Sequence, residues 1–385
     1  SRGLGDVYKR QFQWNPFSLP VQKMSLQNHG TENPLWKIST LRTRFFKYTS
    51  RINLLPMSLS LEELALKADV SKTTVSLVLN GKSSIYRISK ETENRILKIA
   101  KDHNYKPNSI ARALRLNKSL TIGLIIPYLN RHFGRVAEVI EQNARELGYQ
   151  IIIAVTQDCL NTEHDLIENL YERNVDGLIL ATMMNRDQFN DLSSKIKIPI
   201  VLVDRRIDGD DIAWVVSDDE QGTYELVSVL CQEGVKDIYF VGGIEKLSTS
   251  IDRLNGFKKA LLDQGVECNQ SKIQQIGYAV ADGYEMTKNI IERFSKTPEA
   301  IFTSAITLLE GLLQYAKEHK PDLFSHTRVI TYDDHPMLDY LQPPIFSVRQ
   351  NAEEIAKKSF EIMHGILEKN RSFAQELIKP ELILR

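Results

Sequence analysis

A run of short polar side chains opens a predicted helix near residue 72. It consists of Lys72, Thr73, Thr74 and Ser76, which lie away from the apolar stripe of the same helix. An ammonium group and hydroxyls at the start of a helix suit hydrogen bonds to phosphates and to base edges of DNA. The run favours nucleic-acid contact, whereas a helical module that only packs leaves the exposed hydroxyls unexplained.

The segment "NYKPNSIARALRLNKS", residues 104–119, combines basic and apolar residues at helical spacing. Arg112 and Arg115 accompany Ile110 and Leu114, which lie one helical turn apart. A helix of two turns is marginal in water, because nucleation costs more than so few hydrogen bonds return. On DNA, the basic side chains would meet phosphates while Leu114 wedges between base steps in the minor groove. A plain interdomain linker is the alternative.

Charged and hydroxyl side chains also gather where predicted strands end and a predicted helix begins near residue 252. They are Asp204, Arg205, Ser250, Arg253, Asp333 and Asp334. Open α/β sheets bind ligands at the carboxyl ends of their strands. Carboxylates suit the hydroxyl groups of a ligand, and guanidinium groups suit a phosphate through their fork geometry. For each residue taken alone, a surface ion pair is the alternative.

Three predicted helices position the polar run. Ser60 and Glu63 form a capping box for the first helix, and Ser71 and Ser89 cap the second and third. The residues expected to point inward are Leu61, Leu64, Ala65, Ala68, Val75, Val78, Leu79, Ile96, Leu97, Ile99 and Ala100. A helix, a short turn and a second helix make a helix-turn-helix, whose second helix enters the major groove of DNA.

From Thr121 onward, buried strands alternate with amphipathic helices. The predicted strands are "TIGLIIP", "QIIIAV", "GLILAT", "IPIVLVD", "KDIYFVGG", "AIFTSA" and "RVITYDD". Continuous apolar strands joined by helices indicate parallel sheets covered on both faces. So many units exceed one core, and we therefore expect two doubly wound lobes with a ligand cleft between them.

The charge distribution indicates the kind of partner. The 385 residues contain 49 basic and 49 acidic residues. Residues 1–56 carry nine Lys and Arg against two acids, and residues 57–120 carry twelve against six. A basic front end on an acidic body predicts a polyanionic partner for the front end alone.

Several classes of protein are disfavoured. The sequence shows neither a run of 18 apolar residues nor a leader pattern, so we expect a cytoplasmic protein. Cys159, Cys231 and Cys268 lie far apart without clustered His, so we expect buried thiols and no disulfide or metal site. We expect no cofactor and no catalysis, because nucleophile motifs, phosphate loops and dinucleotide fingerprints are missing from the sequence.

Residues 59–115, "LSLEELALKADVSKTTVSLVLNGKSSIYRISKETENRILKIAKDHNYKPNSIARALR", strongly resemble the lac-repressor family of bacterial transcription regulators. Within that family the chain is similar to the fructose and sucrose operon repressors. The likeness continues through "TIGLIIP", "NVDGLIL", "PIVLVDRR", "FVGGIEKLSTSIDRLNGF", "IFTSAITLLEGLL" and "YDDHPMLDYL". It covers about residues 57–385, whereas residues 1–56 have no counterpart.

The resemblance implies roles for side chains of the front end. Base-reading positions fall on Lys72, Thr73 and Leu77, of which Leu77 would make an apolar contact, for example to a thymine methyl group. The other implied DNA-contacting residues are Ser71, Thr74, Ser76, Asn80, Arg87 in the loop "GKSSIYRIS", and Asn108, Ala111 and Leu114 of a hinge helix.

The resemblance also implies a sensor body like the periplasmic sugar-binding proteins, with a sugar or sugar phosphate between the lobes. The implied effector-contacting residues are Asp204, Arg205, Ser250, Arg253, Ser304, Asp333, Asp334 and Gln350. Gln350 lies where the chain crosses between lobes. Ser304 supplies polarity where the family often has Asn or Asp near Ala305.

We expect an all-α helix-turn-helix domain followed by an α/β core of two doubly wound parallel-sheet lobes, like that of periplasmic binding proteins. The expected segments are an extension outside the family (1–56), the helix-turn-helix (57–104), the hinge helix (105–119) and an effector-binding and dimerisation domain (120–385). That last domain should comprise an N-lobe, residues 120–218 plus 350–375, and a C-lobe, residues 219–349.

The expected function is that of a homodimeric repressor of sugar-metabolism genes. It would bind double-stranded operator DNA under allosteric control by a fructose-type sugar or sugar phosphate. A sugar-binding receptor without DNA function is the main rival, which the helix-turn-helix disfavours. An enzyme is a weaker rival, in which the strand-end aspartates would bind a metal or act as acid and base.

Overall fold

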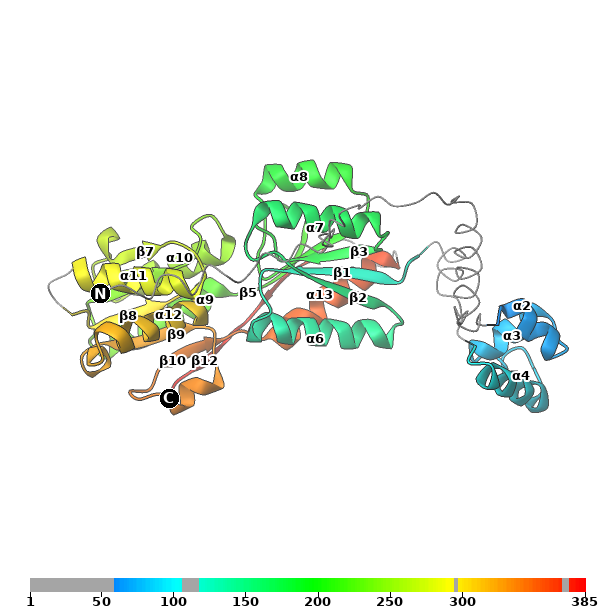
Figure 1. The fold of residues 1–385 in the computed structure, drawn as a ribbon. Helices are drawn as coiled ribbons and strands as arrows, with labels where there is room; N and C mark the ends of the chain where they lie inside the picture. The colour runs from blue at the N-terminus through cyan, green and yellow to red at the C-terminus, as the bar shows by residue number, and fades with distance from the viewer. Residues whose placement is uncertain (1–58, 106–117, 294–296, 369–373) are drawn as a thin grey trace, which may run out of the picture. The chain divides into compact units, whose positions relative to one another are not determined.

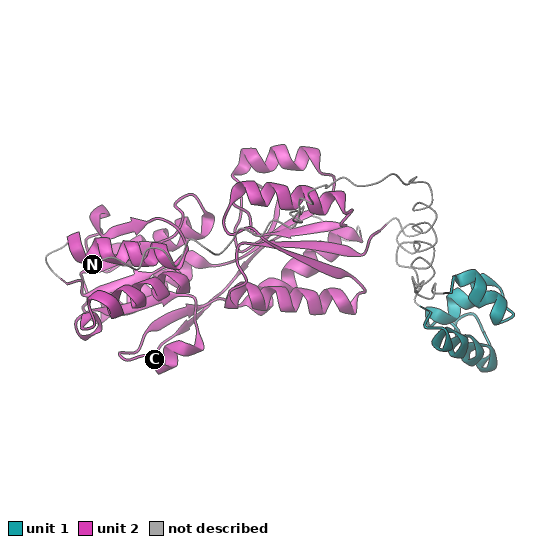
Figure 2. Ribbon diagram, in the orientation of Figure 1, with its two compact units in different colours: residues 1–107 teal, residues 108–385 magenta. Residues whose placement is uncertain are grey.

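The computed structural model describes residues 59–105, 118–293, 297–368 and 374–385. The chain divides into two compact units, residues 1–107 and 108–385 (Figure 2). The predicted extension and the hinge positions Asn108, Ala111 and Leu114 lie outside the described residues. Within the described ranges, none of the helices is both long and apolar enough for a membrane span.

The described part of the first unit contains three helices. They are α2 (Leu61–Lys67), α3 (Lys72–Leu79) and α4 (Lys90–Asp102). The predicted caps are confirmed: Ser60 Oγ accepts the N–H of Glu63 at 3.2 Å, and the Glu63 carboxylate accepts the N–H of Ser60 at 2.7 Å. Ser71 and Ser89 each cap the following helix through the side-chain oxygen.

The small core of this unit joins all three helices. Leu64, Val75 and Ile96 are fully buried, and each such side chain contributes about 1.5–3 kcal/mol. The prediction that Leu97 points inward is wrong, because this side chain is 44% exposed. Successive helical residues are rotated by about 100°, so the face that buries Ile96 and Ala100 leaves Leu97 toward solvent.

The second unit contains two six-stranded sheets (Figure 1). The first sheet runs in the order β11-β5-β4-β3-β1-β2, with all its strands parallel. Its strands are β1 (Thr121–Ile126), β2 (Gln150–Val155), β3 (Gly177–Leu180), β4 (Ile200–Val203), β5 (Ala213–Ser217) and β11 (Gln375–Ile378). We call this sheet with its helices the N-lobe.

Helices cover both faces of the N-lobe sheet. One face packs on α6 (Arg131–Glu146) and α13 (Ala352–Leu367), and the other on α7 (Leu160–Glu172) and α8 (Arg186–Lys195). Neighbouring residues of β1 belong to opposite cores: Leu124 packs with the first pair of helices and Ile125 with the second. The apolar run of this strand therefore reflects burial on both faces.

The C-lobe repeats this plan in the strand order β12-β10-β9-β8-β6-β7. Its strands are β6 (Ile238–Gly242), β7 (Ile273–Gln275), β8 (Ala300–Thr303), β9 (Arg328–Tyr332), β10 (Phe346–Arg349) and β12 (Glu381–Ile383). Its helices are α9 (Asp219–Gln232), α10 (Ser248–Asp263), α11 (Val280–Arg293) and α12 (Ile306–His319), with short 3-10 turns at Gln270–Lys272, Leu323–Ser325 and Pro336–Tyr340. One sheet face packs on α9 and α10, and the other on α11 and α12.

The chain passes between the lobes three times. It crosses after β5, after β10 and again between β11 and β12. The first crossing follows β5, which ends at Ser217, and the second follows β10, which ends at Arg349. The third was not predicted: residues 376–378 extend the N-lobe sheet, and β12 returns to pair antiparallel with β10. The prediction of buried thiols is wrong for Cys159 and Cys268, which are exposed.

Candidate functional site

The first candidate site is the exposed side of α3. Ser71, Lys72, Thr73 and Asn80 are exposed, while Val75 and Val78 on the opposite side are buried. Thr74, Ser76 and Leu77 are partly exposed. The polar run and Leu77 therefore lie on the surface, where a duplex can reach them.

Several of these side chains already have partners. The Lys72 ammonium forms an ion pair with the Glu62 carboxylate of α2. The hydroxyl of Thr74 lies 2.9 Å from that of Ser71, and Asn80 Nδ2 donates to the backbone oxygen of Ser76 at 2.6 Å. The surface ion pair contributes little and is easily exchanged. Lys72 can therefore leave Glu62 for DNA at small cost.

Arg87 lies in the loop between α3 and α4, three residues before α4 begins at Lys90. Its side chain is exposed, and its backbone has a φ of +52°, which is uncommon outside glycine. The loop is closed by the N–H of Ile88, which donates to the Ser83 oxygen at 2.9 Å. The turn therefore fixes the position from which the Arg87 side chain extends into solvent.

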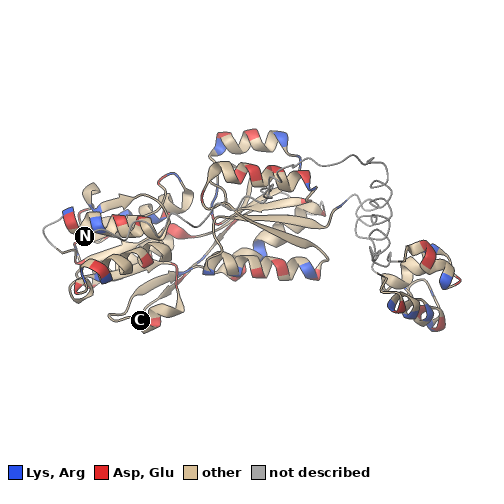
Figure 3. Cartoon of the chain, viewed as in Figure 1, with Lys and Arg blue, Asp and Glu red and all other residues tan. Residues whose placement is uncertain are grey.

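The described helices carry only part of the predicted basic excess. Residues 59–105 contain eight Lys and Arg against six Asp and Glu, and both signs alternate along α4 (Figure 3). Most of the excess therefore belongs to residues 1–58 and 106–118 of the sequence. Attraction to a polyanion should depend on those segments as well as on the helices.

The second candidate site is a cavity between the N-lobe and the C-lobe. Of the eight predicted effector residues, five line it: Asp204, Arg205, Arg253, Asp333 and Gln350. This inner cavity has a volume of about 50 Å³. It opens into an outer pocket of about 720 Å³, and Asn130, His132, Ile306, Asp333 and Gln350 line both.

The N-lobe wall of the inner cavity holds two buried acid–base pairs. Arg205 Nη2 lies 2.7 Å from Asp158 Oδ1, and His132 Nε2 lies 3.3 Å from Asp204 Oδ1. Each of these four side chains is 10% exposed or less. Burial alone lowers the pKa of His132, but the hydrogen bond and charge of Asp204 outweigh burial and raise that pKa above its ordinary value.

The effect on Asp204 is the reverse. Burial raises the pKa of its carboxyl group, but the hydrogen bond and charge of His132, together with the charge of Arg205, bring that pKa below its ordinary value. Both shifts favour an imidazolium beside a carboxylate.

The C-lobe wall is organised around Arg253. Its Nη1 donates to the backbone oxygen of Ser304 at 2.7 Å, and its Nη2 lies 3.2 Å from Asp219 Oδ2. The guanidinium carbon lies 3.9 Å from the centre of the Tyr332 ring. At the crossing after β10, Gln350 Nε2 donates to Asp333 Oδ1 at 2.7 Å. These contacts fix Arg253 and Asp333 before any ligand arrives.

Several buried atoms of this cavity lack hydrogen-bond partners within the described part of the chain. They include Nε and Nη1 of Arg205, Nε of Arg253 and Oε1 of Gln350. Buried polar atoms are normally hydrogen-bonded, and each exception calls for a partner. A ligand rich in hydroxyl or phosphate oxygens supplies such partners.

Three predicted effector residues do not line the inner cavity, and one of them, Asp334, lines the outer pocket. Ser250 is buried and its Oγ lies 2.8 Å from the Tyr278 hydroxyl, so it supports Tyr278 instead. Ser304 contributes its backbone oxygen to Arg253. The carboxylate of Asp334 is taken up by Ser347, Arg349 and Arg385, and the two arginines help to lower its pKa against the opposing effect of burial.

The expected helix start near residue 252 is also corrected, because α10 begins at Ser248. Ser250 and Arg253 therefore both lie within its first two turns. The apolar pattern of the helix does not begin before Ile251, which is why the sequence alone placed the start too late.

Of the 16 residues that line the inner cavity, 11 were not predicted from the sequence. The further polar residues are Tyr128, Asn130, His132, Asp158, Thr249, Tyr278 and Thr307. Tyr128 and Asp158 follow strands β1 and β2, a signal that was available and not used. His132 and Thr249 lie in the first turns of α6 and α10, with no local pattern to mark them.

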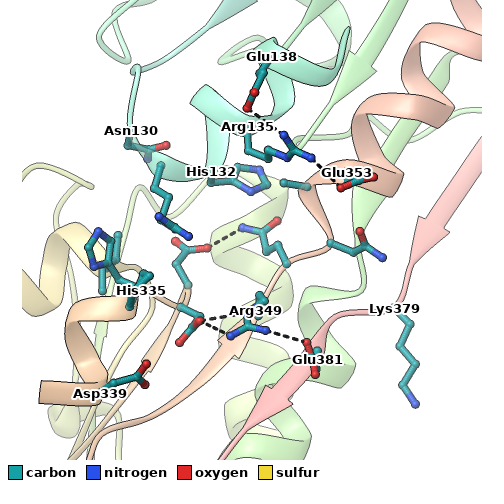
Figure 4. A pocket seen from close by; sticks show the side chains of 18 residues that line it. Asn130, His132, Arg135, Glu138, His335, Asp339, Arg349, Glu353, Lys379 and Glu381 are labelled. Carbon is teal, nitrogen blue, oxygen red and sulfur yellow. Dashed lines mark hydrogen bonds and ion pairs between the residues drawn. The ribbon is translucent and has the colours of Figure 1, made fainter. Parts of the chain in front are cut away.

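The outer pocket carries charged side chains from both lobes (Figure 4). Arg135 of α6 pairs with Glu353 of α13, and Arg349 bridges Asp334 and Glu381. Arg131 and Lys379 also line this pocket. Among the described residues, no His, Cys, Asp and Glu group has the arrangement of a metal site.

Two family models match the sequence. Residues 60–108 match "Bacterial regulatory proteins, lacI family", and residues 119–375 match "Periplasmic binding proteins and sugar binding domain of LacI family". The sequence is 34% identical to the sucrose operon repressor of Klebsiella pneumoniae, over 80% of this chain and 92% of the relative. It is 32% identical to the catabolite repressor/activator of Salmonella typhimurium, over 81% of this chain and 93% of the relative.

A solved structure extends the comparison to three dimensions. It is that of the Cra transcriptional dual regulator from Pseudomonas putida in complex with fructose 1-phosphate. The alignment has a TM-score of 0.63 and 26% identity, and it covers 69% of this chain and 98% of that chain. It therefore extends over most of the two-lobed unit.

Proposed function

The chain belongs to the LacI family of bacterial regulatory proteins, and from that premise we propose that it is a homodimeric repressor whose operator affinity is lowered by a fructose-type sugar or sugar phosphate. Family and fold agree with those expected from the sequence. A regulator of this class acts in the cytoplasm, where its operator DNA lies. The two similar relatives are named as a repressor and a repressor/activator, which favours a role without catalysis.

The observation that carries the effector proposal is the set of unpartnered buried atoms in the inner cavity. Arg205, Arg253 and Gln350 keep hydrogen-bonding capacity at buried atoms of this cavity. Leaving such groups unsatisfied costs about 1–3 kcal/mol each. A ligand that forms hydrogen bonds with these atoms regains this free energy on binding. The cavity therefore favours a polar ligand.

The charges of the cavity indicate a polyol. Three basic groups, His132, Arg205 and Arg253, face three carboxylates, Asp158, Asp204 and Asp333. A balanced set of donors and acceptors suits the hydroxyls of a sugar, which both donate and accept. Arg131 in the adjoining outer pocket is suited to a phosphate group carried by that sugar.

The operator is assigned to the exposed side of α3. We assign base reading to Lys72, Thr73 and Leu77, and phosphate contact to Ser71, Thr74, Ser76, Asn80 and Arg87. The exposure of Lys72 and Thr73 supports base reading, and the fixed position of Arg87 supports phosphate contact. Asn108, Ala111 and Leu114 are assigned to the minor groove on the basis of their sequence alone.

Dimer formation is assigned to the edge strands β2 and β7 of the two sheets. β2 is an edge strand of the N-lobe, with Ile152 36% and Ile153 43% exposed. β7 is an edge strand of the C-lobe, and Ile276 beside it is 49% exposed. Exposed apolar side chains on edge strands favour pairing with a second copy. Two copies then present two recognition helices to a pseudo-palindromic site.

The test is operator binding titrated with candidate effectors. Duplexes selected by the protein from a random pool are used to measure affinity by fluorescence anisotropy, alone and with fructose, fructose 1-phosphate, fructose 1,6-bisphosphate or sucrose. One of these should weaken binding about 5- to 150-fold, the usual range of allosteric coupling. Unchanged affinity with all four ligands would reject this effector class, and a lack of sequence preference would reject operator recognition.

A further inference from the structure

Arg206 connects the two lobes outside the inner cavity, next to the cavity residues Asp204 and Arg205. Its guanidinium forms a two-pronged ion pair with Asp252 of α10, in which Nη2 lies 3.0 Å from Oδ1 and Nη1 pairs with Oδ2. The backbone N–H of Arg206 donates to Ser248 Oγ at 2.9 Å. Arg206 belongs to the N-lobe, whereas Ser248 and Asp252 belong to the C-lobe.

This pair shares its two supporting segments with the inner cavity. Asp204 and Arg205 face the cavity, while the next residue, Arg206, faces a separate groove behind it. On α10, Thr249 and Arg253 face the cavity, while Asp252 faces the same rear groove. A ligand that moves either segment therefore acts directly on the ion pair.

The ion pair is well placed to resist such a movement. The side chain of Arg206 is 27% exposed and that of Asp252 is 12% exposed, so solvent screens their attraction only partly. A planar guanidinium that meets both carboxylate oxygens is more directional than a single contact. A small rotation of one lobe against the other separates the two groups.

The size of the inner cavity gives the direction of the effect. Pockets that enclose small ligands usually measure about 300–1,000 Å³, whereas this cavity measures about 50 Å³. The adjoining outer pocket of about 720 Å³ is large enough for a sugar, but Arg205 and Arg253 do not line it. A sugar that contacts these two arginines therefore requires the walls of the inner cavity to move apart or to rearrange. The arrangement held by Arg206 and Asp252 opposes that change.

We propose that Arg206 and Asp252 form an interlobe latch that holds the lobes in the arrangement with the small cavity and thereby sets the threshold for the effector. Arg206 is a positioning residue, because it acts through Asp204 and Arg205 and not on the ligand. The link from the latch to operator affinity rests on the proposed function. Effector binding opens the latch, and the latch in turn weakens effector binding by the same factor.

Charge reversal separates the latch from mere folding. R206D and D252R each place two like charges together, whereas the double variant R206D/D252R restores the attraction with the charges exchanged. Each single variant should bind the effector about fivefold or more tightly and the operator correspondingly less tightly. The double variant should return both affinities toward those of the wild type.

A matched control is available within the N-lobe. Arg186 and Asp211 also form an ion pair in which the guanidinium meets both carboxylate oxygens, here through one nitrogen, with Nη2 2.7 Å and 2.8 Å from the two oxygens. This pair does not link the lobes. R186D, D211R and their double variant should leave the effector affinity unchanged.

The lobe arrangement is measured independently of any sugar. Spin labels on Cys268 of the C-lobe and on E172C at the end of α7 report the interlobe distance, in a background of C159S and C231S. Labelled chains are diluted with unlabelled ones, so that distances within one chain dominate. R206D and D252R should shift or broaden the distance distribution, and the double variant should reverse this change.

The outcomes distinguish the latch from the proposed function. Unchanged distances in both single variants, or weaker effector binding in them, overturn the latch even if wild-type protein responds to sugar. Failure of double-variant rescue with correctly folded protein also overturns it. If wild-type protein responds to none of the four sugars while the distances shift and recover as described, the effector proposal fails and the latch stands.

Discussion

Asp204 and Asp333 occupy matching places in the two lobes. Each is the first residue after the third strand of its sheet order, β4 in the N-lobe and β9 in the C-lobe. Each has a positive φ, 66° and 69° respectively. Asp tolerates this region better than most residues, and strained conformations cluster where a ligand is bound. The duplicated fold thus presents one carboxylate from each lobe to the same cavity.

The first prediction concerns D333N. Asn also tolerates a positive φ and its amide oxygen still accepts from Gln350, so the backbone and the crossing should be preserved. The variant loses the charge offered to ligand hydroxyls, worth about 1.5–3 kcal/mol per hydrogen bond. Effector affinity measured by calorimetry should fall about tenfold or more. D191N, at an exposed carboxylate of α8, should bind the effector normally, and equal losses in both variants would contradict the assignment.

The second prediction concerns pH and His132. Folding raises the pKa of His132, so the stabilisation is complete below the unfolded value of about 6.5 and is lost as the pH rises through the raised value. The partner Asp204 has a lowered pKa, so its contribution is present above about pH 3.9 and is lost only as the pH falls through the lowered value. The pair therefore stabilises the fold in the window between these limits.

Denaturant unfolding at several pH values checks this sign. The free energy of unfolding of the wild type should decrease above about pH 6.5 relative to that of H132N, by about 1.4 kcal/mol for each unit by which the pKa is raised. H326N, at an exposed histidine of the C-lobe, should keep the wild-type dependence. Parallel curves for wild type and H132N would show that folding does not raise the pKa of His132.

The third prediction distinguishes a residue of the first unit that contacts bases from one that contacts phosphates. K72A should cost about 1–3 kcal/mol on the operator and relax the preference at one base pair. R87A should weaken binding to all duplexes equally and reduce the slope of log affinity against log salt by about one. Anisotropy titrations over a range of salt concentrations measure both. The assignments are reversed if R87A changes the preferred sequence and K72A does not.

The fourth prediction concerns Leu114. L114S replaces the apolar wedge proposed for the minor groove with a small polar side chain. Binding to the operator should weaken far more than binding to a scrambled duplex of the same length. R115A provides the contrast, because a lost phosphate contact should weaken both duplexes alike. A similar loss on both duplexes with L114S would exclude the wedge.

The fifth prediction concerns Gly243 behind the cavity. A Cβ atom there would come within 2.1 Å of the ring of Tyr278, which lines the inner cavity. G243A should displace Tyr278, cost about 1–3 kcal/mol of stability and weaken effector binding. G134A in α6 is the control, because its Cβ meets no neighbour within 4 Å, and it should stabilise the helix by roughly 0.5–1 kcal/mol. Normal effector affinity in G243A would show that the position of Tyr278 is unimportant.

Local patterns in the sequence determined most of the elements and the kind of protein. The caps Ser60, Ser71 and Ser89 mark helix starts because their side chains bond backbone N–H groups only three residues away. The seven predicted strands appear as β1–β4, β6, β8 and β9. Most of them are continuously apolar because they are buried on both faces, whereas β2 is an apolar edge strand with exposed residues. Strands with polar neighbours or few residues, such as β7 and β12, lack that signal.

Tertiary structure decided which polar side chains form the site. His132 meets Asp204 and Asp158 meets Arg205 across more than forty residues of sequence, and neither pairing has a local pattern. Conversely, Asp334 follows a strand as Asp204 does, yet the third crossing brings Arg385 to it and makes it structural. The spacing of apolar residues along a helix or strand shows which of its faces is buried. The partner of a buried charge depends instead on how elements distant in the sequence pack together. The sequence therefore determined the fold class and the family, and packing between the lobes decided the cavity and the latch.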